Sequence, residues 1–331
     1  MKKSELINKY LQRIPKLDMS LLPTPTHRLN NLSGRLSINL YCKRDDLTAF
    51  AFGGNKVRKL DYLVMDAITT GYDSLITFGA VQSNWCRMTS AAGKVNGLDV
   101  FLVLAGEKPE KDTANLLLDK MAGADISYIE SIERDDIVRE VERKAQELKD
   151  AGRNPYYMPV GGSVARGSLG YIQAMAEILQ YSENHEVEFK DIIVASGSAG
   201  TQAGLVAGQI ISGWQGRITG MAVSRGSDEQ EQNVINIARD TLELVGYKYK
   251  EDHLGELVVV DDNYLGEGYR MITTECCQAI EDFVRYEGIY LDEVYTGKAA
   301  AGLIDYAVRK TFSSGSSVLF VHTGGNVQLF E

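Results

Sequence analysis

The fold class is indicated most clearly by residues 191–205, DIIVASGSAGTQAGL, in a chain of 331 residues. Residues 191–195 have the apolar run of a buried strand, the next residues are mostly Gly and Ser, and a helix is predicted from about Thr201. A strand that enters a helix through a glycine-rich loop is the building unit of parallel α/β folds. The free N–H groups and positive end of such a helix would also suit a bound phosphate.

The same alternation extends outward over most of the chain, from about residue 56 onward. After extended segments at 22–26 and 40–44, the predicted strands are 74–78, 99–104, 125–129, 191–195, 217–223, 257–260 and 318–322. The predicted helices are 57–68, 113–121, 135–149, 169–179, 234–245 and 276–286, with two more that begin near 83 and 201. A chain of this length is expected to form two domains. We place a small domain at 56–161, between residues 1–55 and 162–331 of a larger domain.

Composition and charge exclude several classes of protein. The formal net charge of -10 and the lack of a dense Lys/Arg run argue against binding to nucleic acid or to an anionic membrane. No stretch approaches the roughly 18–20 apolar residues of a membrane helix, so we expect a cytoplasmic protein. The cysteines form no C-x-x-C pair and are expected to be reduced. The histidines have no ligand-like spacing, so no metal site is predicted.

The Gly/Ser loop at 197–201 is compatible with more than one role. An ordinary turn between strand and helix would explain its glycines, because such turns alone are weak indicators of function. It is not a P-loop, since no Lys-Ser/Thr pair follows at the required spacing. Ser198 does not fit a nucleophile elbow either, because residue 196 is Ser rather than Gly. A phosphate cradle of backbone amides is the functional alternative left open.

Two further clusters place polar groups at the starts of helices. Residues 53–60, GGNKVRKL, put three cations where they oppose the helix dipole, at a cost of up to ~1 kcal/mol each. A nearby anion would remove this conflict, although a solvated helix start is the ordinary explanation. Ser83 is a natural helix N-cap, and Asn84 offers a polar group at the carboxyl edge of a strand. Trp85 could equally be a core residue.

Taken in order, these motifs resemble the D-cysteine desulfhydrase and 1-aminocyclopropane-1-carboxylate (ACC) deaminase family of pyridoxal-phosphate (PLP) enzymes. The similarity covers nearly the whole chain. The matching motifs are LPTP (22–25), KRDDL (43–47), GGNK (53–56), QSN (82–84), PVGGS (159–163), the Gly/Ser loop with AGL (203–205), VYTGK (294–298) and HTGG (322–325). The resemblance implies the tryptophan synthase β-like fold (fold type II), with two three-layer α/β/α domains and mainly parallel sheets.

The resemblance also implies roles for the matching residues. Lys56 would hold PLP as a Schiff base and move the substrate's Cα proton, and Lys59 would help to neutralise the phosphate. Asn84 would bond the PLP 3′-oxygen, and Thr296 would face the ring nitrogen. The phosphate would be cradled by Gly197, Ser198, Ala199, Gly200 and Thr201. Catalysis and substrate binding would involve, besides Lys56, the residues Ser83, Asn84, Trp85, Tyr269, Tyr295, Thr323 and Gly324.

Three residues bear on the choice of substrate. Thr296 stands where ACC deaminases carry Glu, and a neutral hydroxyl suits β-elimination better than the opening of a cyclopropane ring. Trp85 stands where relatives more often have a smaller or more polar residue, so we expect a reshaped pocket. Arg166 could offer a fork to a second anionic group, as in a cysteate sulfo-lyase, although an exposed loop arginine is the simpler interpretation.

We therefore predict a PLP-dependent lyase that eliminates the β-substituent of a small amino acid and releases ammonia, with D-cysteine as the best single candidate. ACC deaminase, cysteate sulfo-lyase and a racemase or cyclase branch are alternatives within the enzyme class. A catalytically silent PLP-binding protein and a phosphate-binding module without PLP are alternatives outside it. The intact set of Lys56, Ser83 and Tyr295 argues against these last two. The resemblance makes a homodimer the expected assembly.

Overall fold

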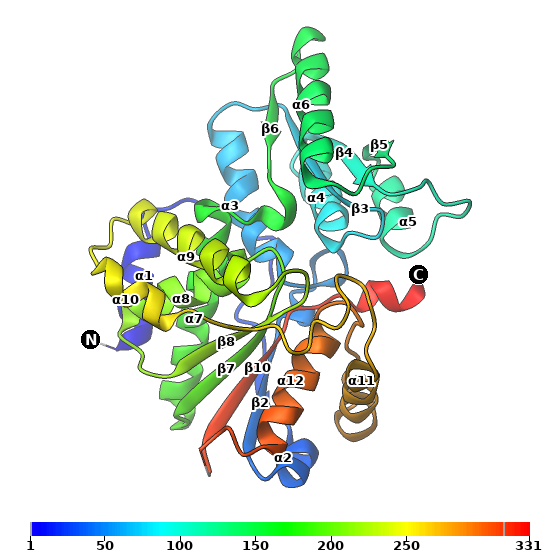
Figure 1. Ribbon diagram of the computed structural model, residues 1–331. Helices are drawn as coiled ribbons and strands as arrows, with labels where there is room; N and C mark the ends of the chain where they lie inside the picture. The colour runs from blue at the N-terminus through cyan, green and yellow to red at the C-terminus, as the bar shows by residue number, and fades with distance from the viewer. Residues whose placement is uncertain (1, 314) are drawn as a thin grey trace.

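Two mainly parallel β-sheets with helices packed around them form the protein (Figure 1). The computed structural model describes residues 2–313 and 315–331. In the larger sheet the strand order is β1 (Thr26–Arg28), β2 (Asn39–Arg44), β10 (Ser317–His322), β7 (Phe189–Ser196), β8 (Arg217–Ala222) and β9 (Val259–Asp261). In the smaller sheet it is β5 (Asp125–Ile129), β4 (Asp99–Ala105), β3 (Ser74–Ala80) and β6 (Pro155–Tyr157). Strand β1 pairs antiparallel with β2, and the other strand pairs among the described residues are parallel.

Helices alternate with these strands along the chain. The α-helices of the described residues are α1 (Lys3–Leu11), α2 (Asn30–Leu36), α3 (Lys56–Thr69), α4 (Asn84–Val95), α5 (Ala114–Met121), α6 (Arg134–Asp150), α7 (Ala165–His185), α8 (Gly200–Ser212), α9 (Ser227–Leu244), α10 (Glu251–Leu257), α11 (Thr274–Glu287) and α12 (Thr296–Val308). Short 3-10 turns are η1 (Asp45–Leu47), η2 (Phe50–Phe52), η3 (Val160–Gly162) and η4 (Asn326–Phe330). The strand-loop-helix unit predicted from residues 191–205 is therefore confirmed as β7, a loop and α8.

Most predicted elements are confirmed with shifts of a few residues at their ends, but four helices and the short strand β6 were missed. Helix α9 begins at Ser227, earlier than predicted, and the segment predicted as a strand at 257–260 forms β9 only from Val259. The unpredicted helices are α1, α2, α10 and α12. Helix α12 is rich in Ala and Gly and is buried around much of its surface, so it lacks the polar face on which a periodic pattern depends.

Helices cover both faces of the larger sheet. Helices α1, α7, α8 and α9 enclose one hydrophobic core, and α2, α11 and α12 enclose another on the opposite face. Helices α7 and α8 approach closely because Gly204 has no side chain: a Cβ there would lie 2.3 Å from the carbonyl oxygen of Ser168. This close packing fixes the start of α8 relative to the sheet.

The smaller sheet forms a separate layered unit, drawn mostly in cyan and green in Figure 1. Its strands all fall within residues 74–157, inside the segment predicted as the small domain. Helix α3 contributes to both parts, because Val57 and Leu60 pack in the core beneath the smaller sheet while the helix also contacts α7. The predicted boundaries at 56–161 stay a prediction.

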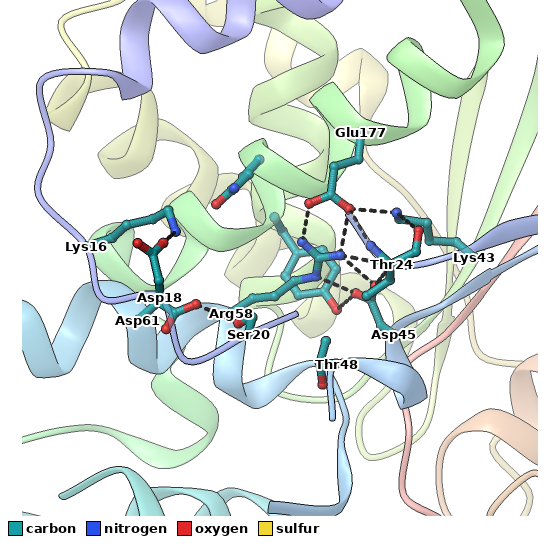
Figure 2. Close-up of polar contacts among 12 residues, drawn as sticks. Lys16, Asp18, Ser20, Thr24, Lys43, Asp45, Thr48, Arg58, Asp61 and Glu177 are labelled. Atoms are coloured by element: carbon teal, nitrogen blue, oxygen red, sulfur yellow. Dashed lines mark hydrogen bonds and ion pairs between the residues drawn. The ribbon is translucent and has the colours of Figure 1, made fainter. Parts of the chain in front are cut away.

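A buried ion network joins the N-terminal segment, α3 and α7 (Figure 2). Arg58 is 0% exposed and forms ion pairs of 2.8 Å with both Asp45 and Glu177. Lys43 reaches the same Glu177 at 2.6 Å, and the Tyr171 hydroxyl donates to Asp45 at 2.6 Å. Burial alone would raise the pKa of Asp45 and Glu177, but the charge of Arg58 and its hydrogen bonds lower both values. The carboxylates are therefore ionised, and Arg58 stabilises the negative charge of each.

We predict that Arg58→Met lowers the free energy of unfolding by about 3–5 kcal/mol, because it leaves two buried carboxylates without their arginine partner. The lowered pKa values mean that the network stabilises the fold fully at neutral pH, and that this stabilisation is lost as the pH falls through those values. The difference in the free energy of unfolding between the native chain and the variant should therefore narrow as the pH falls. Urea titrations over a pH series measure both effects.

Arg285→Met is the matched control, because Arg285 pairs with Glu281 on the surface of α11, with both side chains about three-fifths exposed. Such a pair contributes at most about 1 kcal/mol. Equal losses in the two variants would contradict the role assigned to Arg58.

Candidate active site

A cavity of about 920 Å³ lies where the carboxyl ends of β7 and β10 face the carboxyl end of β3. Parallel α/β sheets bind ligands at this edge of their strands. Most of the predicted site residues line this cavity: Lys56, Ser83, Asn84, Trp85, Gly197, Ser198, Ala199, Thr201, Tyr269, Tyr295, Thr323 and Gly324. The lining does not include Lys59, Gly200 or Thr296.

Lys56 is the first residue of α3, and its amine reaches the cavity. Its Nζ donates to Asn55 Oδ1 at 2.9 Å and lies 6.0 Å from the centre of the Tyr295 ring. Burial lowers the pKa of Lys56 to about 8; the charge of Asp292 opposes this shift, and that of Arg87 adds to it. A larger fraction of the amine is therefore neutral near pH 7 than for an ordinary lysine, which makes Lys56 a competent nucleophile and base.

The glycine pair before Lys56 allows the chain to turn tightly into α3. Gly53 has φ +72°, and a Cβ there would lie 1.9 Å from the carbonyl oxygen of Asp46. The next residue, Asn55, is tied to the larger sheet: its backbone N–H donates to the carbonyl oxygen of Thr323 at 2.9 Å, and its side chain donates to Thr201 at 3.1 Å. Lys56 is thus held next to the start of α8.

The Gly/Ser loop passes into the N-terminus of α8, where backbone N–H groups lack partners within the helix. Ser163 braces the loop from behind, donating to Ser198 Oγ at 2.8 Å and accepting from the Gly200 N–H at 3.3 Å. Gly200 is required here, because a Cβ would lie 2.8 Å from Ser163 Oγ and 3.0 Å from Lys59 Nζ. The loop therefore presents amides and hydroxyls to the cavity from a rigid support.

Lys59 lies behind this loop and not in the cavity wall. It is fully buried, and its Nζ donates to the carbonyl oxygen of Gly161 at 3.0 Å. Burial holds its pKa well below the usual range, and the charge of Lys56 adds to this shift. An anion at the α8 N-terminus would stabilise the charged form of Lys59. Lys59 would then help to neutralise a phosphate from behind the loop, without lining the cavity.

Ser83 and Asn84 stand at the start of α4, at the end of the cavity formed by the smaller sheet. Ser83 Oγ accepts from the Cys86 N–H at 3.2 Å, so the residue is the helix N-cap that the sequence predicted. The Asn84 side chain donates to Gln328 at 3.1 Å and accepts from Asn115 at 3.2 Å. Nothing in the sequence near Asn84 indicates these two partners, because they come from η4 and α5.

Tyr269 and Tyr295 form a hydroxyl pair on the opposite wall, with their oxygens 2.7 Å apart. Burial raises the pKa of both residues, so both hydroxyls keep their protons near neutral pH. Lys298 supports the turn before Tyr269 by donating to the carbonyl oxygens of Leu265 and Gly268 at 2.6 and 2.9 Å. The pair can therefore donate a proton to a substrate group between the walls.

Arg87 is a buried cation that the sequence analysis did not assign. It is 2% exposed, and its Nη2 donates to the carbonyl oxygen of Gly53 at 3.1 Å. Its Nε and Nη1 are buried without a hydrogen-bond partner among the described residues. Burial lowers the pKa of Arg87 to about 10, and the charge of Asp119 opposes this shift. Arg87 therefore holds a positive charge beneath the cavity, close enough to Lys56 to affect its pKa.

Thr296, which was expected to face the ring nitrogen, is not part of the cavity lining. Thr296 is fully buried, and its hydroxyl donates to Asp292 Oδ1 at 2.6 Å while accepting from the Asp292 N–H at 2.9 Å. These bonds hold the turn that starts α12, and the contact of Thr296 with a ring nitrogen stays a prediction. Thr323, at the end of β10, is the threonine that lines this part of the cavity.

Trp85 and Arg166 also have structural partners. Trp85 is 1% exposed, and its indole N–H donates to Thr77 at 2.8 Å, so the ring packs in the core below the smaller sheet. Trp85 also lines the cavity, and its expected effect on the shape of the pocket stays a prediction. Arg166 forms a 3.1 Å ion pair with Asp66 and is not part of the cavity lining.

The residues present fit PLP. The cavity combines an amine of lowered pKa on Lys56, a rigid loop of amides and hydroxyls for a phosphate, and the amide of Asn84. The charged lining residues are mostly cations, namely Lys56, Arg87, Arg134, Arg225 and Arg270, against Glu107 and Glu331. Such a lining favours an anionic ligand in a chain whose net charge is -10.

Comparison with known proteins agrees with this geometry. The family model described as "Pyridoxal-phosphate dependent enzyme" matches residues 17–324. The chain belongs to this family. It is 40% identical over 319 residues to a Pyrococcus furiosus protein provisionally named 1-aminocyclopropane-1-carboxylate deaminase, covering 96% of this chain and 94% of the relative. It is 37% identical over 325 residues to the D-cysteine desulfhydrase of Klebsiella pneumoniae, covering 97% of each.

The solved structure of an ACC deaminase homologue superposes with a TM-score of 0.89 at 39% identity, covering 98% of this chain and 96% of the homologue. The predicted tryptophan synthase β-like fold (fold type II) is confirmed, and so is the prediction that the enzyme depends on PLP. Among residues 2–313 and 315–331, no helix is long and apolar enough to cross a membrane. In the same part of the chain, no group of three or more His, Cys, Asp or Glu side chains could hold a metal ion.

We predict that Lys56→Ala abolishes turnover and the covalent attachment of PLP, because no other lysine lines the described part of the cavity. Borohydride reduction followed by peptide mass spectrometry measures attachment. In the native chain, attachment should slow as the pH falls below about 8, where Lys56 holds its proton. Lys120→Ala, which removes a surface partner of Asp112, should label as the native chain does. An adduct on Lys59 would contradict the assignment.

Proposed function

We propose that this enzyme catalyses the α,β-elimination and deamination of a small β-substituted amino acid, with D-cysteine converted to pyruvate, sulfide and ammonia. The observation that carries the proposal is the position of Lys56, whose amine of lowered pKa lies between the α8 loop and the two tyrosines. The names of the relatives, D-cysteine desulfhydrase and 1-aminocyclopropane-1-carboxylate deaminase, support the same reaction class.

When bound, PLP supplies an electron sink that stabilises negative charge at the substrate's Cα. The protein residues would then divide the remaining work. Lys56 Nζ removes the Cα proton, and the Ser83 and Asn84 segment at the α4 N-terminus holds the substrate carboxylate. The Tyr269 and Tyr295 hydroxyls face the β-substituent and donate a proton as it leaves.

The neutral groups near the end of β10 favour β-elimination over opening of the ACC ring. We assign the ring-nitrogen contact to Thr323, because it lines the cavity and Thr296 is bonded to Asp292. A hydroxyl does not hold the ring nitrogen protonated as a carboxyl group would, so the electron sink is weaker. A leaving group that accepts the electrons at once suits a weak sink. ACC deamination is the second candidate, supported by the names of two relatives.

We further propose that the enzyme is a homodimer in the cytoplasm. Leu21, Leu47 and Phe52 are exposed apolar side chains on neighbouring segments, joined by the hydrogen bond from the Leu21 N–H to the carbonyl oxygen of Thr48. Such a patch favours association with a second copy. The cysteines Cys42, Cys86, Cys276 and Cys277 are all free thiols, as is usual in a reducing compartment.

The assay that tests the proposal supplies D-cysteine, L-cysteine, D-serine and ACC separately to the PLP-loaded enzyme and identifies the oxo acid by mass spectrometry. We predict pyruvate and sulfide from D-cysteine. Release of 2-oxobutyrate from ACC as the major activity would favour the second candidate. Absence of any oxo acid from the whole panel would contradict elimination chemistry.

A further inference from the structure

Arg270 is a cavity residue that neither the family motifs nor the chemistry above uses. It follows Tyr269 directly, and its side chain lines the cavity together with that of Glu331. The Tyr269 hydroxyl lies 2.7 Å from that of Tyr295. The charge of Arg270 lowers the pKa of both tyrosines, in opposition to burial.

The backbone at Arg270 is held in an unfavourable conformation. Its φ is +64°, in the left-handed region that residues with a side chain seldom adopt. Strain of this kind persists only where surrounding structure holds it, and it concentrates at functional sites. Here Lys298 fixes the preceding turn through the carbonyl oxygen of Gly268. The strained backbone is thus built into the wall that carries the two tyrosines.

Glu331 holds the guanidinium without consuming all of its donors. The Nη2 atom of Arg270 lies 2.6 Å from both carboxylate oxygens of Glu331. A guanidinium carries five N–H donors on three nitrogens, and this contact uses one nitrogen. Arg270 and Glu331 are about one-third and two-fifths exposed, so an entering anion could share the cation.

We propose that Arg270 recognises a negatively charged β-substituent of the substrate, and that amino acids with a β-sulfonate are therefore a substrate class of this site. The inference rests on the proposed elimination function and specifies its substrate. Lys56 Nζ is 6.0 Å from the centre of the Tyr295 ring, so a substrate with its Cα at Lys56 can reach the tyrosine pair with its β-substituent. Arg270 stands beside that pair, where a sulfonate could accept from its guanidinium.

The reaction balances with water as the second reactant. The Cα–H bond breaks with its proton going to Lys56, the Cβ–S bond breaks with its electron pair leaving on sulfite, and a Cα=Cβ double bond forms. The released 2-aminoacrylate then reacts with water to give pyruvate and ammonia. No atom changes oxidation state in a way that needs an external oxidant or reductant.

The test compares kcat/KM for cysteate and for cysteine, each as the enantiomer that reacts, with sulfite and sulfide release as readouts. We expect the native enzyme to release sulfite from cysteate as well as sulfide from cysteine. Arg270→Gln should reduce the ratio of kcat/KM for cysteate to kcat/KM for cysteine at least tenfold, through the KM for cysteate. Glu331→Gln should raise the ratio, because it removes the competing carboxylate. Arg285→Gln, an exposed arginine on α11, is the control and should leave the ratio unchanged.

A binding measurement separates recognition from turnover. Calorimetric titration of the PLP-loaded enzyme with 3-sulfopropanoate, which has no amino group to react, should show weaker binding in Arg270→Gln, whereas 3-mercaptopropanoate should bind both proteins alike. A ratio and an affinity unaffected by Arg270→Gln, with cysteine still eliminated, would overturn this inference and leave the proposed function intact. Absence of pyruvate from both substrates would overturn both.

Discussion

The fully buried pairing of Arg58 with Asp45 and Glu177 is the interaction on which the placement of the active site depends. Arg58 lies in the first turn of α3, two residues after Lys56, so the network fixes the rotation of the helix that carries the reactive amine. The first turn of this helix holds three cations at the end where the dipole disfavours them. Each one has its own environment: Arg58 has carboxylates, Lys59 has the carbonyl oxygen of Gly161, and Lys56 faces the cavity. Arg58 and Lys59 therefore have structural partners, whereas Lys56 is available for the reaction.

The site itself is assembled from the carboxyl ends of strands in two sheets, so no single segment of the chain contains it. The turn after β2 and η2 delivers Lys56, the loop after β7 offers amides to a phosphate, and the turn after β3 places Ser83 and Asn84. Close approach at Gly53 and Gly200 lets these turns meet without side chains between them. Burial then lowers the pKa of Lys56. The packing of the site thus makes this amine more reactive.

Local chemistry allowed the sequence to predict much of this arrangement. The strand-loop-helix unit at 191–205 and the N-cap at Ser83 follow from short-range rules, and both are confirmed. Contacts between distant segments could not be predicted in the same way. Asn84, for example, donates to Gln328 and accepts from Asn115, and neither partner is near it in the sequence. Arg58 likewise pairs with Glu177, which lies 119 residues later in the chain. Helix α12 was missed because it is buried around much of its surface and shows no polar stripe.

The central claim is that a PLP molecule bridges Lys56 and the loop before α8. A crystal structure of the protein loaded with PLP tests it most directly. The account predicts continuous density between Lys56 Nζ and the cofactor, with the phosphate against residues 197–201 and the ring beside Asn84 and Thr323. Density that joins the cofactor to another lysine, or a phosphate away from the α8 N-terminus, would contradict the account.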